Sequence, residues 1–128
     1  MTVRLDHTIV HTPDREASAA FFAEVFGRPA PKAFGPFLVV EVDGGVSLDF
    51  HHTDGPVPPE HYAFLVGDAD FDEIFGRVQA RGVPYFADPM GQHEGEINDH
   101  DGGRGVYFAG PEGHWYEIIT VPYGGWPT

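Results

Sequence analysis

The feature that most constrains the fold is an internal repeat, because the two halves of the 128-residue sequence contain the same order of elements. Each half opens on a short apolar strand with an early histidine, His7 or His61, and continues into a helix that ends at a glycine. Each half closes on a strand with a central acid, Asp49 or Glu117. This repetition predicts two copies of one strand–helix–strands module within the chain.

In the first half, the pattern predicts a strand over residues 3–10 and a helix over residues 14–26 that ends before Gly27. Thr12 and Pro13 supply an N-cap and a first-turn proline for that helix. Residues 29–36 contain three prolines, which predict a loop or a short edge strand. Two further strands follow, over residues 37–42 and 46–51, with a glycine-containing turn between them.

The second half begins after a proline-rich joint at residues 56–59. We predict a strand over residues 61–66, a helix with Asp70 and Glu73 as a capping pair that ends before Gly82, and a short strand over residues 83–86. A hairpin with strands 104–109 and 114–120 completes the half. Loop 87–103 makes this half the longer one, and the sequence leaves open whether this loop is a lid or a mobile surface loop.

Glu117 lies in the middle of the last strand, on the same face as Trp115 and Ile119. A buried carboxylate is costly unless it is paired with a cation, protonated or bound to a metal. If the two modules curve into one cup, His7, His61, Asp49 and Glu117 face a common interior. Two imidazoles and a carboxylate then form a facial site for a divalent metal, namely Fe(II), Mn(II), Ni(II), Co(II) or Zn(II).

Composition removes several classes of function. The formal net charge of −13 and the seven scattered Lys and Arg residues argue against nucleic acid and against an anionic membrane surface. The sequence has no cysteine, which excludes disulfides, thiolate metal sites and cysteine nucleophiles. No signal segment and no apolar run of membrane-spanning length is recognisable, so we expect a cytoplasmic protein.

The sequence resembles the vicinal oxygen chelate superfamily, which includes glyoxalase I, fosfomycin-resistance transferases, extradiol dioxygenases and bleomycin-resistance proteins. The resemblance runs from LDHTIV through HYAFLV to YFAGPEGHWYEI and so covers nearly the whole chain. It implies an α+β fold in which two βαβββ modules form a curved, cup-like mixed sheet with helices outside. Residues 1–128 then form a single domain, with modules at about 1–55 and 56–128, and a short strand is implied within residues 31–34.

The resemblance also implies a metal site. The three-ligand pattern of the superfamily falls on His7, His61 and Glu117, which come from both modules. Asp49 occupies the position at which some relatives place a fourth carboxylate ligand. Because aspartate is one methylene shorter than glutamate, ligation, a water-mediated or substrate contact, and a solvated acid near the strand end all stay open for Asp49.

A second pattern resembles the extradiol dioxygenases more closely. It comprises Asn98-Asp99-His100, Val106-Tyr107, and then Pro111, Gly113 and Glu117. In those enzymes, the histidine and the tyrosine act beside the substrate and dioxygen. The pattern therefore implies that His100 and Tyr107 are catalytic, although Gly110 departs from the usual residue before the proline.

Aromatic and basic residues near these positions are candidates for substrate binding. The candidates are Phe37, Phe50, Trp115 and Arg104. The aromatic ones, like Tyr107, are equally compatible with a place in the core, and Arg104 with an ion pair to Asp99 or Asp101. We assign the histidines without a repeat partner to surface or turn positions: His11, His51, His52, His93 and His114.

These residues predict a metal-dependent enzyme whose small-molecule substrate chelates the metal through adjacent oxygens, by isomerase, lyase or dioxygenase chemistry. The alternative is a metal-independent protein that sequesters an antibiotic drug, as bleomycin-resistance proteins do. Retention of all three ligand residues favours the enzyme. The resemblance also implies a homodimer.

Overall fold

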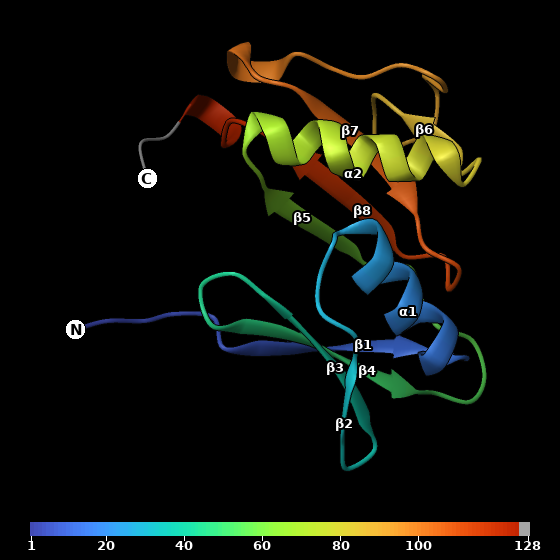
Figure 1. Ribbon diagram of the computed structural model, residues 1–128. Coiled ribbons are helices and arrows are strands. Elements are labelled where there is room, and N and C mark those ends of the chain that lie inside the picture. Colours follow the sequence, from blue (N-terminus) through green and yellow to red (C-terminus); the bar gives the residue numbers. More distant parts are fainter. Residues whose placement is uncertain (126–128) are drawn as a thin grey trace. The chain divides into compact units, whose positions relative to one another are not determined.

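The computed structural model describes residues 1–125 and divides the chain into two compact units, Met1–Pro58 (unit 1) and Pro59–Thr128 (unit 2). Within the described residues, each unit contains one α-helix and one four-stranded sheet (Figure 1). The strand orders are β1-β4-β3-β2 in unit 1 and β5-β8-β7-β6 in unit 2. Both sheets are open and mixed, so the prediction of an α+β fold with two βαβββ modules is confirmed.

Unit 1 contains β1 (His7–Thr12), α1 (Arg15–Val25), β2 (Lys32–Phe34), β3 (Phe37–Val42) and β4 (Val46–His52). The short strand β2 falls in the proline-punctuated segment where the resemblance implied it, and it pairs antiparallel with β3. Strand β1 begins at His7, four residues later than predicted. The reason lies in its partner, because β4 begins at Val46 and His7 already pairs with Ser47 near that end.

Unit 2 contains β5 (His61–Leu65), α2 (Asp68–Ala80), β6 (Tyr85–Phe86), β7 (Gly105–Ala109) and β8 (Trp115–Ile119). Two 3₁₀ turns, η1 (His100–Gly102) and η2 (Tyr123–Gly125), accompany them. Parallel pairing of β5 with β8 repeats the pairing of β1 with β4. The repeat seen in the sequence is therefore a repeat of sheet topology.

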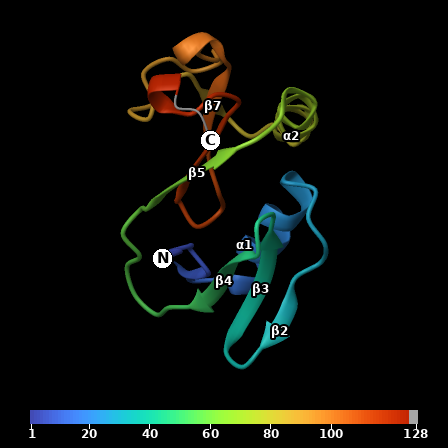
Figure 2. The same ribbon diagram turned by 90° about the vertical axis from the view of Figure 1, so that its left-hand side faces the viewer.

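Each helix covers one face of its own sheet. In unit 1, α1 contacts β1, β3 and β4, and the ring of Phe22 lies 6.0 Å from that of Phe50, both fully buried. In unit 2, Phe71, Ile74 and Val78 of α2 are buried, and Phe75 meets Tyr85 edge-on at 4.8 Å. Figure 2 shows α2 nearly end-on, to one side of the strands of its unit. Strand residues of the opposite parity point to the other face of each sheet.

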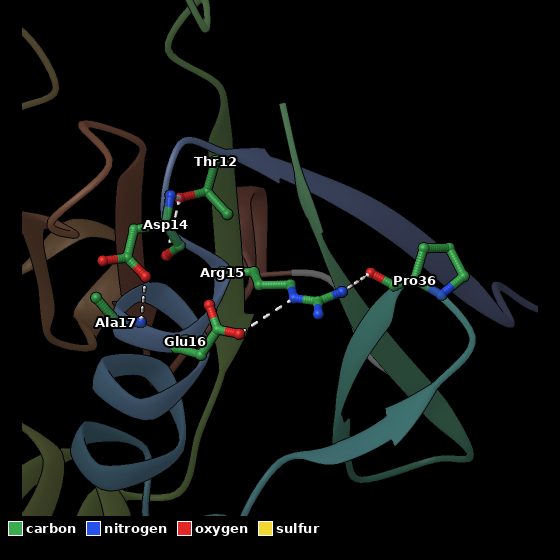
Figure 3. Close-up of polar contacts among 6 residues, drawn as sticks. All are labelled: Thr12, Asp14, Arg15, Glu16, Ala17 and Pro36. Carbon is green, nitrogen blue, oxygen red and sulfur yellow. Dashed lines mark hydrogen bonds and ion pairs between the residues drawn. The ribbon is translucent and has the colours of Figure 1, made fainter. Parts of the chain in front are cut away.

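The helix starts differ from the predicted ones. Asp14, rather than Thr12, is the N-cap of α1, and its carboxylate accepts a hydrogen bond of 3.1 Å from the backbone N–H of Ala17 (Figure 3). Thr12 is buried and its hydroxyl lies 2.7 Å from that of Ser18. Helix α2 begins after Gly67 without a side-chain cap, so the predicted capping role of Asp70 is wrong. Asp70 is the third residue of α2 and lies three positions after the N-cap, Gly67.

None of the helices within residues 1–125 has the length and apolar character needed to cross a bilayer.

The contrast between the two helix starts is measurable. We expect Asp14→Ala to lower the free energy of unfolding by about 1 kcal/mol, because it removes the acceptor of the Ala17 N–H. Asp70→Ala should cost about 0.5 kcal/mol or less, since it loses only a favourable interaction with the helix dipole. Chemical denaturation of both variants beside the parent chain tests this, and equal losses would contradict the assigned cap.

Candidate functional site

Glu117 is the centre of the polar cluster in unit 2. It is the middle residue of β8 and is only 1% exposed. One carboxylate oxygen, Oε1, lies 2.8 Å from Nε2 of His61. The other, Oε2, accepts a hydrogen bond from the hydroxyl of Tyr123. The carboxylate that the sequence marks as costly is thus engaged through both of its oxygens.

Strand pairing brings these side chains together. Ala63 of β5 and Tyr107 of β7 are both opposite Glu117, on either side of β8. His61, two residues before Ala63, shares its face, and its ring lies 5.6 Å from that of Tyr107 in an edge-on arrangement. One face of the unit 2 sheet therefore carries His61, Tyr107 and Glu117 in one cluster.

The two tyrosines form a chain of hydroxyls that ends on the carboxylate. Their oxygens are 3.0 Å apart, and because a phenol has one proton, which Tyr123 donates to Glu117, Tyr107 donates to Tyr123. Burial, followed by the hydrogen bond to Tyr123, raises the pKa of Tyr107 well above its usual range. Burial and the bond to Glu117 raise the pKa of Tyr123 as well. Both phenols are therefore proton donors at neutral pH.

Tyr123 is the site residue that the sequence interpretation missed. It lies in η2, beyond the last strand, in a segment with prolines and glycines on both sides. No periodicity marks such a segment. The available signal was a lone aromatic residue with a polar tip, six residues after a buried acid.

Unit 1 holds the corresponding residues in a different arrangement. Nδ1 of His7 lies 2.7 Å from the carboxylate of Asp6. Asp49 accepts a hydrogen bond of 2.8 Å from the hydroxyl of Ser47. The hydrogen bond to Asp6, with a further contribution from the charge of Asp49, raises the pKa of His7. Asp49 therefore acts on His7 through its charge, whereas Glu117 contacts His61 directly.

Within the part of the chain that the structure describes, no group of three or more histidine and acidic side chains is gathered as a metal site. Unit 2 by itself brings together two of the three predicted ligands, His61 and Glu117. The third predicted ligand, His7, belongs to unit 1. The three-ligand set stays a prediction.

The predicted aromatic substrate residues divide between two environments. Trp115 is half-buried on the face of Glu117 and meets Phe86 edge-on at 5.5 Å. Phe37 is half-buried and lies 5.4 Å from the ring of His51, on the face of Asp49. Phe50 is fully buried on the opposite face, under α1. Phe50 is therefore a core residue, the other role that the sequence allowed.

Arg104 does not face the candidate site. It precedes Gly105 of β7, on the α2 side, where its guanidinium contacts Asp72 at 2.7 Å and Asp68 at 3.2 Å. It also lies over the ring of Phe71, 4.4 Å from its centre. The carboxylates of α2 occupy Arg104, so the alternative pairing with Asp99 or Asp101 is corrected, and the anionic substrate contact stays a prediction. Strand alternation is the cause, because Tyr107, at the opposite parity, points to the other face.

Loop 87–103 is anchored to its unit. The backbones of Asn98 and Gly105 exchange hydrogen bonds of 2.9 and 3.0 Å, and the side-chain amide of Asn98 donates to the carbonyl of Ala87. A Cβ at Gly105 would approach Oδ1 of Asn98 to 2.7 Å, so a larger residue there would displace the Asn98 side chain. His100 is exposed in η1 at the end of this loop. Its catalytic role stays a prediction.

The predicted surface position of His114 is wrong. It is fully buried, and its Nδ1 accepts a hydrogen bond of 2.9 Å from the backbone N–H of Glu60. Its ring also meets Tyr62 edge-on at 5.8 Å. His114 thus fixes the entry into β5, the strand that carries His61.

Comparison with known proteins shows which family this chain belongs to. The model of the Glyoxalase/Bleomycin resistance protein/Dioxygenase superfamily matches residues 4–118. The solved structure of Oxidase ChaP-H1 is 61% identical, with a TM-score of 0.94 over 97% of this chain and 100% of its own. The solved structure of Oxidase ChaP-H2 is 52% identical, with a TM-score of 0.95 over 98% of this chain and 100% of its own. Metallothiol transferase FosB of Lysinibacillus sphaericus is 25% identical over 126 residues, which cover 94% of this chain and 84% of FosB.

The position of Arg104 leads to a prediction about stability. Arg104→Ala should lower the free energy of unfolding by about 1 kcal/mol, because it removes the contacts with α2 and with the ring of Phe71. Arg4→Ala, at an exposed position before β1, is the control and should change it by about 0.5 kcal/mol or less. Thermal and urea unfolding measure both. Unchanged stability in Arg104→Ala together with lost binding of an anionic ligand would contradict this structural role and support the predicted substrate contact.

Proposed function

Because the chain belongs to the Glyoxalase/Bleomycin resistance protein/Dioxygenase superfamily, we propose that it is a divalent-metal-dependent enzyme that oxidises a small molecule chelating the metal through two adjacent oxygens. The observation that carries the proposal is the buried carboxylate of Glu117 with His61 beside it at 2.8 Å. Identities of 61% and 52% to two proteins named as oxidases favour oxidation over isomerase or lyase chemistry.

The donor atoms fit such a metal. Two ligand atoms bound to one first-row ion at about 2.1 Å and at right angles lie roughly 3.0 Å apart. The 2.8 Å between Nε2 of His61 and Oε1 of Glu117 is close to that separation. Imidazole with carboxylate is a donor set that Fe(II), Mn(II), Ni(II), Co(II) and Zn(II) accept. These two residues would therefore hold the ion in unit 2.

We propose His7 as the third ligand. Histidines that bind metals commonly donate their other ring N–H to a carboxylate, which fixes the tautomer. The Nδ1 of His7 has such a partner in Asp6, at 2.7 Å, which leaves Nε2 as the donor for a metal. Superfamily membership supports the choice, and the local hydrogen bond is compatible with it.

The bound metal would act as a Lewis acid that stabilises negative charge on the chelating oxygens of the substrate. The protein residues then have separate tasks. Tyr107, whose raised pKa keeps its phenol protonated, is a hydrogen-bond donor beside Glu117. His100 is our candidate for moving a proton to or from the substrate, since histidine is the side chain that most often acts as a general acid or base.

Half-buried aromatic side chains and the net charge indicate the class of substrate. Trp115 and Phe37 are half-buried aromatic side chains on the faces of Glu117 and Asp49. Such rings favour a planar aromatic substrate. The net charge of −13 disfavours a strongly anionic one. We therefore propose an aromatic substrate with adjacent hydroxyl or carbonyl oxygens.

The competing function is metal-independent sequestration of an antibiotic. The aromatic side chains Trp115 and Phe86 on an open sheet face favour it. The direct contact between His61 and the buried Glu117, two of the three predicted ligands, favours the enzyme instead. Homodimerisation in the cytoplasm stays a prediction for either function, and light scattering of the purified chain tests the oligomeric state.

Metal content tests the proposal. Protein purified without chelator or affinity metal should contain about one divalent ion per chain by elemental analysis. His7→Ala, His61→Ala and Glu117→Gln should each contain almost none, because each removes one of three ligands. His52→Ala is the matched control, since His52 is exposed and bonded to Asp54, and it should keep the metal.

A parent protein that gains no metal from Fe(II), Mn(II), Ni(II) or Zn(II) would refute the enzyme proposal. Affinity for a planar antibiotic that His61→Ala leaves unchanged would then support sequestration.

Turnover tests the roles of His100 and Tyr107. We expect metal-loaded protein to consume dioxygen with a member of a panel of aromatic vicinal diols and hydroxyquinones, measured with an oxygen electrode. His100→Ala should lower kcat by about 10²–10⁴-fold with unchanged metal content, because it removes an acid–base group. Tyr107→Phe should also lower kcat. His93→Ala, an exposed histidine of the same loop, should leave turnover unchanged, and equal losses in His93→Ala and His100→Ala would refute the assignment.

A further inference from the structure

We infer that Tyr123 is a positioning residue for Glu117: its hydroxyl engages one carboxylate oxygen and leaves the other, beside His61, to bind the metal. The inference rests on the proposed function and assigns a second task to the segment after β8. It concerns how the carboxylate is presented, and it gives Tyr123 no contact with the substrate.

The two oxygens of Glu117 have different partners. Oε2 accepts the proton of Tyr123, and Oε1 faces Nε2 of His61 at 2.8 Å. A hydrogen bond to one oxygen fixes the rotation of the carboxyl group about its last bond and reduces the donor strength of that oxygen. The arrangement therefore selects a carboxylate that binds through Oε1 alone.

The exposure of Tyr123 indicates that its hydroxyl matters more than its ring. The residue is 53% exposed, whereas Glu117, which it contacts, is 1% exposed. A tyrosine retained for core packing would bury its ring. Here the ring stays largely in solvent while the phenol oxygen reaches a buried acid and also accepts the proton of Tyr107.

A specific contact holds Tyr123 in place. The backbone N–H of Gly124 donates to the carboxylate of Asp101 at 3.0 Å, which ties η2 to η1. Asp101 has a φ of 56°, a left-handed conformation that is uncommon for a residue other than glycine. Aspartate tolerates this region better than most residues, and its carboxylate is the acceptor that the turn uses. Asp101 thus supports Tyr123, which in turn orients Glu117.

Cobalt(II) binding to the metal-free full chain under nitrogen tests the inference, with visible absorption as the readout. Tyr123→Phe removes one oxygen atom and should weaken Co(II) binding by about 10–100-fold, the usual effect of losing a partner of a ligand. The Co(II) absorption bands should also change, because the carboxylate is free to bind through both oxygens. Tyr85→Phe is the matched control, since Tyr85 packs on Phe75 away from Glu117, and it should match the parent.

A second pair of variants acts on the support of Tyr123. Asp101→Gly adopts the left-handed backbone without strain but lacks the carboxylate, and it should weaken Co(II) binding by less than Tyr123→Phe does. Asp101→Asn keeps an acceptor oxygen for Gly124 and should bind Co(II) as the parent does. These variants keep the inference testable if Tyr123→Phe fails to fold, which circular dichroism reports.

The outcomes separate the two proposals. Tight Co(II) binding by the parent with the same affinity and spectrum in Tyr123→Phe would overturn the role of Tyr123 and leave the metal site intact. Absence of Co(II) binding by the parent would overturn both. Weaker binding with altered bands in Tyr123→Phe, together with unchanged binding in Tyr85→Phe, would establish the positioning role.

Discussion

The burial of one carboxylate, Glu117, is the constraint on which the rest of unit 2 depends. An ionised carboxylate in a sheet interior is destabilising unless its oxygens are engaged. Both oxygens of Glu117 are engaged, by His61 from β5 and by Tyr123 from η2. Register places Glu117 beside His61, because a slip of one residue in β8 would turn Glu117 into the apolar core under α2.

The repeat makes the chemistry of unit 1 comparable. Asp49 pairs with Ile9, two residues after His7, just as Glu117 pairs with Ala63, two residues after His61. The backbone frame is thus the same, but aspartate is one methylene shorter. Asp49 bonds to Ser47, and His7 bonds to its neighbour Asp6. The same backbone arrangement therefore holds a direct acid–histidine pair in unit 2, whereas in unit 1 the histidine bonds to a different carboxylate, that of Asp6.

The sequence predicts the order of the elements and the importance of Glu117, and the physical reasons are clear. Strand and helix periodicity with glycine stops predicted the order of elements, and the cost of a buried acid drew attention to Glu117 before any partner was known. What failed depended on contacts between distant residues. Nothing local in the sequence indicates that Arg104 pairs with Asp68 and Asp72. The burial of His114 and the return of Tyr123 onto β8 are likewise set by tertiary packing.

The two units also differ in the length of the loop that precedes the last two strands. Unit 2 differs from unit 1 by loop 87–103, and that loop ends at η1, which contains His100 and Asp101. Its anchor, the Asn98–Gly105 pair, attaches it to the start of β7, the strand that carries Tyr107. Its last turn then binds η2 through Asp101. The loop that carries His100 is thus linked through η2 to Tyr123, which contacts Tyr107 and Glu117. The two modules therefore share one sheet topology, whereas the contact between η1 and η2 belongs to the longer loop of unit 2.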